Sequence, residues 1–170
     1  MPTVPMSIKK VKPTAKSGFK QGYYKPQNPN KYQGPMPIIY RSSWERKVCH
    51  WCDHNADVIR WTSEPFSLKY FNLLTKKFHK YYPDFYVKLK TKVEGSDEYT
   101  YQDYIIEVKP KAQLKKPAPP RKKTKKALEN YKWAYETYVR NLCKTDALQK
   151  AAKTRNFKVM LLTEDSKLFK

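Results

Sequence analysis

Two long segments of this chain contain many lysines and no acidic residue, and they limit which parts of it can form a packed core. Residues 1–37 hold seven lysines and seven prolines, and residues 109–126 hold nine cationic side chains among eighteen positions. Segments of this composition bury little apolar surface, so both are expected to be extended and solvated. The rest of the 170 residues is long enough for one domain with a hydrophobic core and too short for two.

We therefore predict a basic, proline-rich arm over residues 1–37, a folded domain over residues 38–170, and a basic loop within that domain over residues 110–126. The chain has a formal net charge of +21, and sixteen of its positive charges lie in the two acid-free segments. Such an excess indicates a polyanionic partner, and nucleic acid is the expected one. Composition alone does not separate an enzyme from a packaging protein.

A membrane or secretory role is not indicated. No apolar run approaches the roughly 20 residues of a membrane span, and the N-terminus lacks the apolar block of a secretory signal. Cys49, Cys52 and Cys143 are too few, and odd in number, for a disulfide framework. We expect a soluble, intracellular protein with free thiols.

Hydrophobic spacing predicts the helices. Trp44, Val48 and Trp51 recur at helical spacing behind Ser42, which predicts a helix ending near Asn55. After the basic loop, apolar residues recur every three or four positions over 128–142, which predicts a second helix, and a shorter helical piece is expected over 146–154.

Aromatic and β-branched runs predict strands over residues 57–62, 66–71, 78–89, 99–109 and 157–163. We expect the first three to form an antiparallel meander. With the predicted helices, this order indicates an α/β domain built around a mixed sheet.

The strand over 99–109 turns from apolar to charged at its end. Because side chains alternate along a strand, Ile105, Glu107 and Lys109 share one face. The same alternation puts Asp84 on the face of its strand opposite Phe85. Two acids on neighbouring strands could then converge beside a lysine, which is typical of a functional site rather than a solvated surface.

Convergent carboxylates in a cationic protein repel each other unless a cation lies between them, and hard oxygen ligands suit Mg²⁺, with Mn²⁺ as a substitute. Asp84, Glu107 and a backbone carbonyl such as that of Val108 could hold the ion together with a phosphate. Lys109 would then lie beside the attacking water, where a positive charge favours hydroxide. The chemistry indicated is phosphodiester hydrolysis.

Pro83-Asp84 followed by Glu107-Val108-Lys109, with Glu45 on an upstream helix, resembles the PD-(D/E)XK nuclease superfamily. More closely, four stretches within residues 28–164 resemble the head completion nucleases of tailed phages: Ile39–Glu45, Tyr82–Lys90, Tyr104–Pro110 and Leu161–Glu164. The resemblance implies a restriction-endonuclease-like core with a mixed central sheet flanked by helices. It also implies Mg²⁺-dependent cleavage of DNA during head completion, portal or capsid proteins as further partners, and action in the host cytoplasm or in association with the virion.

The resemblance also implies roles for particular residues. Glu45 would assist through a metal-bound water or a second metal ion, beside Asp84, Glu107 and Lys109. In this family a helix after the basic loop carries an asparagine and a lysine three residues apart, although a tryptophan usually follows the lysine where this chain has Thr145. The expected DNA-binding set is Lys115, Lys116, Arg121, Lys122, Lys123, Lys125, Lys126, Asn141 and Lys144.

Several of these residues have simpler explanations. Ser42-x-x-Glu45 is a capping box, in which the glutamate would only bond the backbone amide of the cap. Pro-Asp pairs often form turns, although the aromatic run around Asp84 favours a strand. Tyr23, Tyr24 and Tyr32 could stack on unpaired bases or could anchor the arm to its own domain.

A zinc site is also conceivable at Cys49, His50, Cys52 and His54. However, all four lie on one predicted helix, where the cysteines face one way and the histidines another. Core and surface roles are expected instead.

Two other functions remain open at this point. A noncatalytic packaging or portal protein could use the same basic segments to hold a DNA end. Alternatively, the protein could be a nuclease of the same fold that acts on transposon ends or DNA junctions. Oligomeric state is not indicated by the sequence.

Overall fold

The structure, a computed structural model, describes residues 21–169. In chain order the elements are β1 (Gly22–Tyr24), η1 (Pro29–Lys31), β2 (Ile38–Tyr40), α1 (Ser43–His54), β3 (Val58–Ser63), β4 (Leu68–Asn72), β5 (Lys77–Tyr81), β6 (Phe85–Lys92), β7 (Tyr99–Val108), η2 (Lys111–Leu114), α2 (Lys125–Thr154), β8 (Lys158–Leu162) and η3 (Lys167–Phe169). Within the described residues, no helix has the length and apolar character needed to cross a membrane.

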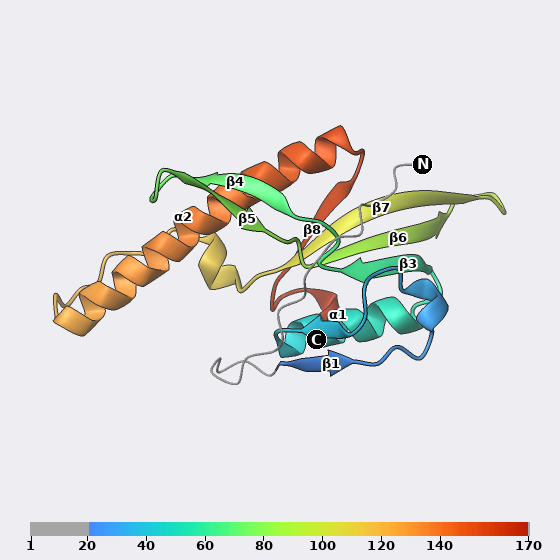
Figure 1. Ribbon diagram of the computed structural model, residues 1–170, viewed down its shortest axis with the longest axis horizontal. Coiled ribbons are helices and arrows are strands. Elements are labelled where there is room, and N and C mark those ends of the chain that lie inside the picture. The colour runs from blue at the N-terminus through green and yellow to red at the C-terminus, as the bar shows by residue number, and fades with distance from the viewer. Residues whose placement is uncertain (1–20, 170) are drawn as a thin grey trace.

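A four-stranded sheet with the order β3-β6-β7-β8 forms the centre of the domain (Figure 1). Strands β3, β6 and β7 pair antiparallel, whereas β8 pairs parallel to β7. Parallel neighbours need a long crossover, which here contains α2. The prediction of an α/β domain with a mixed sheet is confirmed.

The sheet separates two apolar cores. On one face Phe85, Val87 and Ile106 pack with residues of α1, and on the other face Tyr86 and Ile105 pack with residues of α2. Strand alternation explains the division, because neighbouring positions of β6 and β7 point to opposite faces. The predicted split of the strand ending at Val108 into two faces is therefore confirmed.

The predicted meander is wrong. Strand β3 pairs directly with β6, while β4 and β5 form a separate two-stranded hairpin that lies along α2 (Figure 1). The single strand expected over 78–89 is also wrong, because Tyr82, Pro83 and Asp84 separate β5 from β6. Pro83 has no backbone N–H to donate to a ladder, so the chain changes direction there.

Helix α2 is continuous over 30 residues, so the expected break between residues 142 and 146 is wrong. That stretch contains no glycine or proline, and Asp146 makes an i,i+4 ion pair with Lys150 at 2.7 Å instead of capping a new helix. The helix also begins at Lys125, so the basic loop is shorter than predicted, and its first residues form η2.

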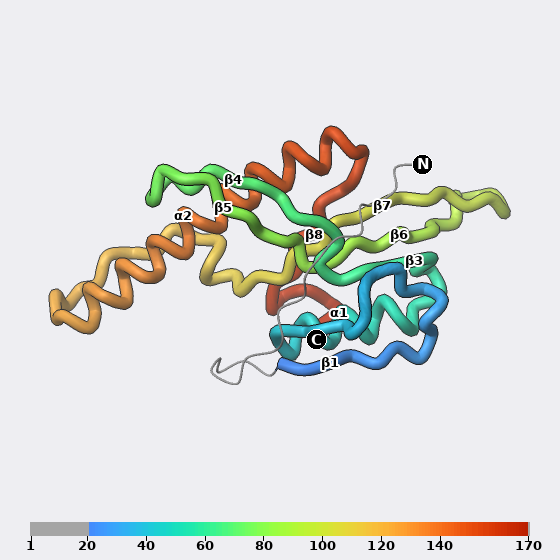
Figure 2. Tube along the Cα trace, viewed as in Figure 1, coloured from blue at the N-terminus to red at the C-terminus, as the bar shows by residue number. Residues whose placement is uncertain are grey.

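The prediction of an extended arm is wrong for residues 21–37. Strand β1 pairs with β2, and this segment runs beside α1 (Figure 2). The fully buried carboxylate of Asp53 accepts hydrogen bonds from the backbone N–H groups of Gln27 and Asn28, at 2.7 and 2.9 Å, and from the Tyr24 hydroxyl at 3.0 Å. Tyr32 packs edge-on against Trp61. Tyr24 and Tyr32 thus anchor this segment to the domain, while residues 1–20 lie outside the described part of the chain.

Candidate active site

Asp84 and Glu107 meet at one end of the central sheet. Asp84 directly precedes β6, and its Oδ2 accepts a hydrogen bond from the backbone N–H of Val108 at 2.7 Å. The β6–β7 register pairs Phe85 with Ile106, so the next position along each strand brings Asp84 opposite Glu107. The two carboxyl groups are close enough for their charges to interact. The predicted convergence of the two acids is confirmed.

Lys109 completes this group. Its Nζ lies 3.2 Å from Glu107 Oε2, and its backbone N–H donates to the Leu162 carbonyl at 2.9 Å. This backbone hydrogen bond continues the parallel β7–β8 ladder by one residue and therefore fixes the backbone position of Lys109. Glu107 and Lys109 therefore lie on the same face, as the strand alternation predicts.

Glu45 lies in the first turn of α1, where its carboxylate holds the residues that precede the helix and borders the other carboxylates. Its Oε2 accepts from the backbone N–H of Arg41 at 2.7 Å, and its Oε1 accepts from the Ser42 hydroxyl at 3.1 Å. It is also close enough to Asp84 for their charges to interact. A pocket of about 410 Å³ runs from Glu45 to Val108 and Pro110. The capping box is confirmed only in part: Ser42 Oγ accepts the Glu45 N–H at 3.1 Å, but the Glu45 carboxylate accepts the N–H of Arg41, one residue before the cap, instead of that of Ser42.

The site is electrostatically strained. Burial and the neighbouring Asp84 carboxylate raise the pKa of Glu107 to about 8, and the same two causes raise the pKa of Glu45 to about 7. Burial opposes the charge on Lys109, but Asp84 and Glu107 outweigh it and raise the pKa of that ammonium. Three acids and one lysine share a poorly solvated space, which favours a bound cation.

Tyr81 is a neighbour of the site that the sequence analysis missed. It is 6% exposed, and among residues 21–169 its buried hydroxyl has no hydrogen-bond partner. Burial, Glu107 and Asp84 raise its pKa, because the phenol lies close enough to the carboxylates to interact with their charges. An unpaired buried hydroxyl is costly and marks a place where a ligand or water could bind. Its position three residues before Asp84 could have indicated this proximity. However, in the single strand expected over 78–89, alternation places Tyr81 and Asp84 on opposite faces.

Asn141 and Lys144 on α2 differ from the exposed cations of the basic loop. Asn141 is buried, and its amide donates to the backbone and side-chain oxygens of Gln113 at 3.4 Å, which ties η2 to α2. Lys144 lies over the Tyr81 ring at 5.4 Å, and burial together with Lys109 lowers its pKa. Lys144 therefore belongs to the carboxylate cluster. The other members of the expected DNA-binding set are exposed: Lys115, Lys116, Arg121, Lys122, Lys123, Lys125 and Lys126.

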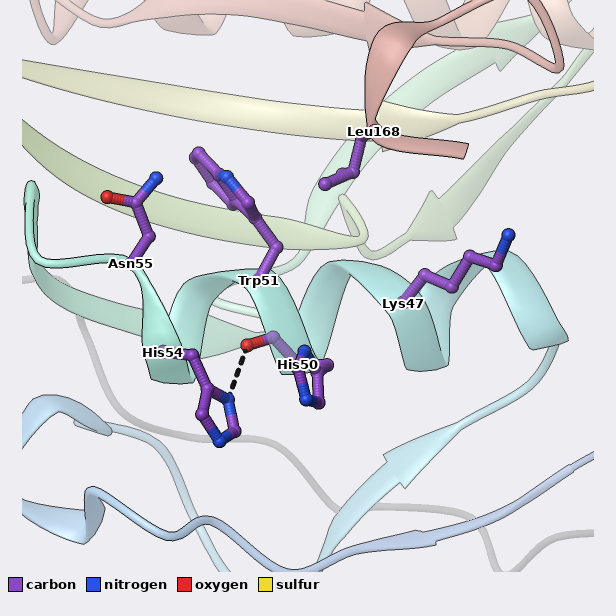
Figure 3. A pocket seen from close by; sticks show the side chains of 6 residues that line it. All are labelled: Lys47, His50, Trp51, His54, Asn55 and Leu168. Atoms are coloured by element: carbon purple, nitrogen blue, oxygen red, sulfur yellow. Dashed lines mark hydrogen bonds between the residues drawn. The ribbon is translucent and has the colours of Figure 1, made fainter. Parts of the chain in front are cut away.

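The cysteines and histidines of α1 do not form a zinc site. Cys49 and Cys52 are buried in the core on one side of the helix. His50 and His54 stack on another side, with ring centroids 4.0 Å apart, beside a pocket of about 450 Å³ (Figure 3). The predicted core and surface roles are confirmed.

The site suits a cation held by few protein ligands. No group of three or more His, Cys, Asp or Glu side chains is arranged to hold a metal among residues 21–169. Asp84 and Glu107 nevertheless converge, and Glu107 Oε2, which is buried, accepts no hydrogen bond within the described part of the chain, although the Lys109 ammonium lies 3.2 Å away. Magnesium often keeps several waters and takes one or two carboxylates plus substrate phosphate, so this donor set fits it.

The raised pKa of Glu107 predicts that the free energy of unfolding of the metal-free protein depends on pH. Between the ordinary glutamate pKa of about 4.3 and its folded value of about 8, the folded state holds a proton that the unfolded state has lost, so stability falls as the pH rises. Glu107→Gln should remove the part of this slope that comes from Glu107 and leave the part that comes from Glu45. At pH 9 in EDTA we expect its melting temperature to exceed wild type by at least about 3 °C, the effect of roughly 1 kcal/mol at this size. Equal slopes for both proteins would contradict the prediction.

Comparison with known proteins identifies the group to which this site belongs. The TnsA-like endonuclease N-terminal family matches residues 55–164, a range that includes Asp84, Glu107 and Lys109 but not Glu45. The head completion nuclease of Enterobacteria phage T4 is 33% identical over 145 residues, which are 85% of this chain and 91% of that protein. No solved structure gives a significant match. The resemblance to the head completion nucleases is confirmed, and the chain belongs to the TnsA-like endonuclease family of nucleases.

Proposed function

We propose that this protein is a Mg²⁺-dependent DNA endonuclease that trims or processes DNA during phage head completion. The observation that carries the proposal is the convergence of Asp84, Glu107 and Lys109 at the end of the central sheet. The family supports an endonuclease, and the similarity to the phage T4 head completion nuclease, over most of both chains, supports this task.

Asp84 and Glu107 would hold the ion, together with the carbonyl of Val108 and with Glu45 through water or a second ion. When bound, Mg²⁺, or Mn²⁺ in its place, supplies a Lewis acid beside the scissile phosphate. The Lys109 ammonium favours the deprotonated form of the attacking water and stabilises negative charge as it develops on the phosphate. The raised pKa of Lys109 keeps this ammonium charged at neutral pH.

The exposed cations between η2 and the first turn of α2 would bind the DNA backbone. Phosphate contacts of this kind position the duplex without reading its sequence. Portal or capsid proteins are proposed as further partners, and the host cytoplasm or the virion as the location. The transposon-end alternative draws support from the family match, whereas the near full-length similarity to a head completion nuclease favours the phage task.

The direct test is incubation of the protein with linear, nicked and branched DNA, with and without Mg²⁺. Cleavage of at least one substrate that requires the ion supports the proposal. DNA binding without any cleavage, under Mg²⁺ and under Mn²⁺, would favour the noncatalytic packaging protein.

The N-terminal tail offers a separate prediction about DNA affinity. Residues 1–20 hold five lysines, and deleting them leaves every described element intact. On duplex DNA each phosphate contact contributes about −0.9 to the slope of log K against log salt. If about half of the five lysines contact phosphates, the deletion should reduce the magnitude of the slope by about 2. Cleavage at saturating DNA should change little. An unchanged slope would assign the tail to an acidic protein surface instead.

A further inference from the structure

The β4–β5 hairpin exposes an unusual amount of apolar and aromatic surface. Phe78 is 71% exposed, and Phe71, Leu73 and Leu74 are also exposed. The two phenylalanines face each other across the hairpin, with ring centroids 5.3 Å apart. A patch of this kind on a soluble domain usually marks an interaction surface.

The hairpin is held firmly in place, so this exposure is not the result of a loose segment. Its other face carries Tyr70 and Tyr81, which are buried against α2 in the second core. At the tip, Asn72 Oδ1 accepts from the backbone N–H of Leu74 at 2.9 Å, and the Lys76 N–H donates to the Asn72 carbonyl at 2.9 Å. The exposed rings are therefore presented on a rigid support.

The charges around the rings indicate what binds them. Residues 65–83 contain four lysines and no acid. Lys69 and Lys80 are directly paired across the hairpin, two residues from the Phe71–Phe78 pair on each strand and therefore on the same face. Like charges placed opposite each other destabilise a hairpin unless an anion compensates them. Exposed aromatic rings flanked by lysines suit single-stranded nucleic acid, because bases stack on the rings while the ammonium groups contact phosphates.

A groove of about 600 Å³ between the hairpin and α2 extends this surface. Phe71, Phe78 and Leu142 border it. The one acid in its lining, Asp146, is neutralised by Lys150 at 2.7 Å. The groove can therefore accept an anionic strand.

The hairpin leads directly into the candidate active site. Phe78 lies six residues before Asp84 along the chain, a span of at most roughly 20 Å in an extended strand. At about 3.4 Å per stacked nucleotide, this corresponds to about six nucleotides. A base held on Phe78 would thus belong to the same DNA molecule as a phosphate held beside Asp84.

We infer that Phe71 and Phe78 form a stacking platform for unpaired bases, so that the substrate is DNA with a single-stranded segment within about six nucleotides of the cleaved bond. This inference rests on the proposed nuclease function, whose substrate it specifies. An apolar protein partner is the competing occupant, but the cross-strand lysines and the proximity of the nuclease site favour DNA.

The test compares two double variants of the full-length protein. Phe71→Leu with Phe78→Leu keeps apolar surface but removes the aromatic faces, whereas Phe71→Tyr with Phe78→Tyr keeps them. Affinities for a single strand and a duplex of equal length are measured by fluorescence anisotropy in EDTA. We expect the leucine variant to lose at least about tenfold in single-strand affinity and less than about threefold in duplex affinity, while the tyrosine variant stays near wild type.

Equal losses on both DNAs, or no loss with leucine, would overturn the inference, and the second result would assign the patch to a protein partner. Melting temperatures close to that of wild type confirm that each variant folds. Because binding is measured without Mg²⁺, the outcome is independent of cleavage. A wild-type protein that binds single strands through these rings but never cuts DNA would refute the proposed function and leave the platform intact.

Discussion

Asp84→Asn and Glu107→Gln should each reduce DNA cleavage at least about a thousandfold, which corresponds to roughly 4 kcal/mol of transition-state stabilisation. Each substitution keeps the shape of the side chain and removes one of the two convergent charges that would hold Mg²⁺. Asp84 Oδ2 also accepts the Val108 N–H, a bond that the asparagine oxygen can still make. The loss should therefore arise from metal binding and not from misfolding.

DNA affinity, unlike the cleavage rate, should not fall in these two variants. The cations that would contact phosphates lie in the basic loop, the β4–β5 hairpin and residues 1–20 and are unchanged in these variants, and the two carboxylates repel a phosphate when no ion is present. In EDTA both variants should bind DNA as tightly as wild type or more tightly. Asp97→Asn is the matched control, because Asp97 is a fully exposed acid paired with Lys92 in the β6–β7 turn. A wild-type cutting rate in either site variant would refute the site assignment.

Lys109→Met should lose about a hundredfold or more in turnover while retaining Mg²⁺ affinity, because the ammonium acts on the water and the phosphate and supplies no ligand oxygen. Lys144→Met is the informative comparison. Both ammonium groups lie near the carboxylates, but Lys109 Nζ is 3.2 Å from Glu107 whereas Lys144 lies over the Tyr81 ring. The Lys144 variant should therefore lose much less turnover.

Isothermal titration with Mg²⁺ separates the two roles that Lys109 could have. Unchanged affinity with lost turnover supports a role at the attacking water. If affinity falls in parallel with turnover, the lysine instead holds the carboxylates in position, and the mechanism proposed for it is wrong.

Strand β7, which carries the candidate site residues, was predictable because its signals are local. Alternation along β7 placed Glu107 and Lys109 on one face, and the apolar residues before them required a buried strand. The helix beginning after Ser42 was equally clear, since a cap and its hydrophobic spacing lie within twelve residues. In both cases the deciding interactions connect residues that are close in sequence.

The errors concern interactions between distant residues. Alternation in residues 66–81 indicates strands but does not indicate which strands they pair with. The same pattern therefore fits both a hairpin that packs on α2 and a meander within the central sheet. Residues 21–37 looked like an arm because their composition is basic and proline-rich, and their anchor, Asp53, lies about 25 residues further along the chain. Tyr81 and Lys144 approach the carboxylates only through the hairpin and α2.

The pairing of β1 with β2 supports the backbone beside the candidate active site. The register places Gly22 opposite Tyr40, one residue before Arg41, whose backbone N–H binds Glu45. Strand β1 thus braces the backbone that leads into this hydrogen bond. Loss of the β1–β2 pairing would consequently loosen the position of Glu45 beside the carboxylates, so a strand that carries no candidate site residue contributes to the geometry of the site.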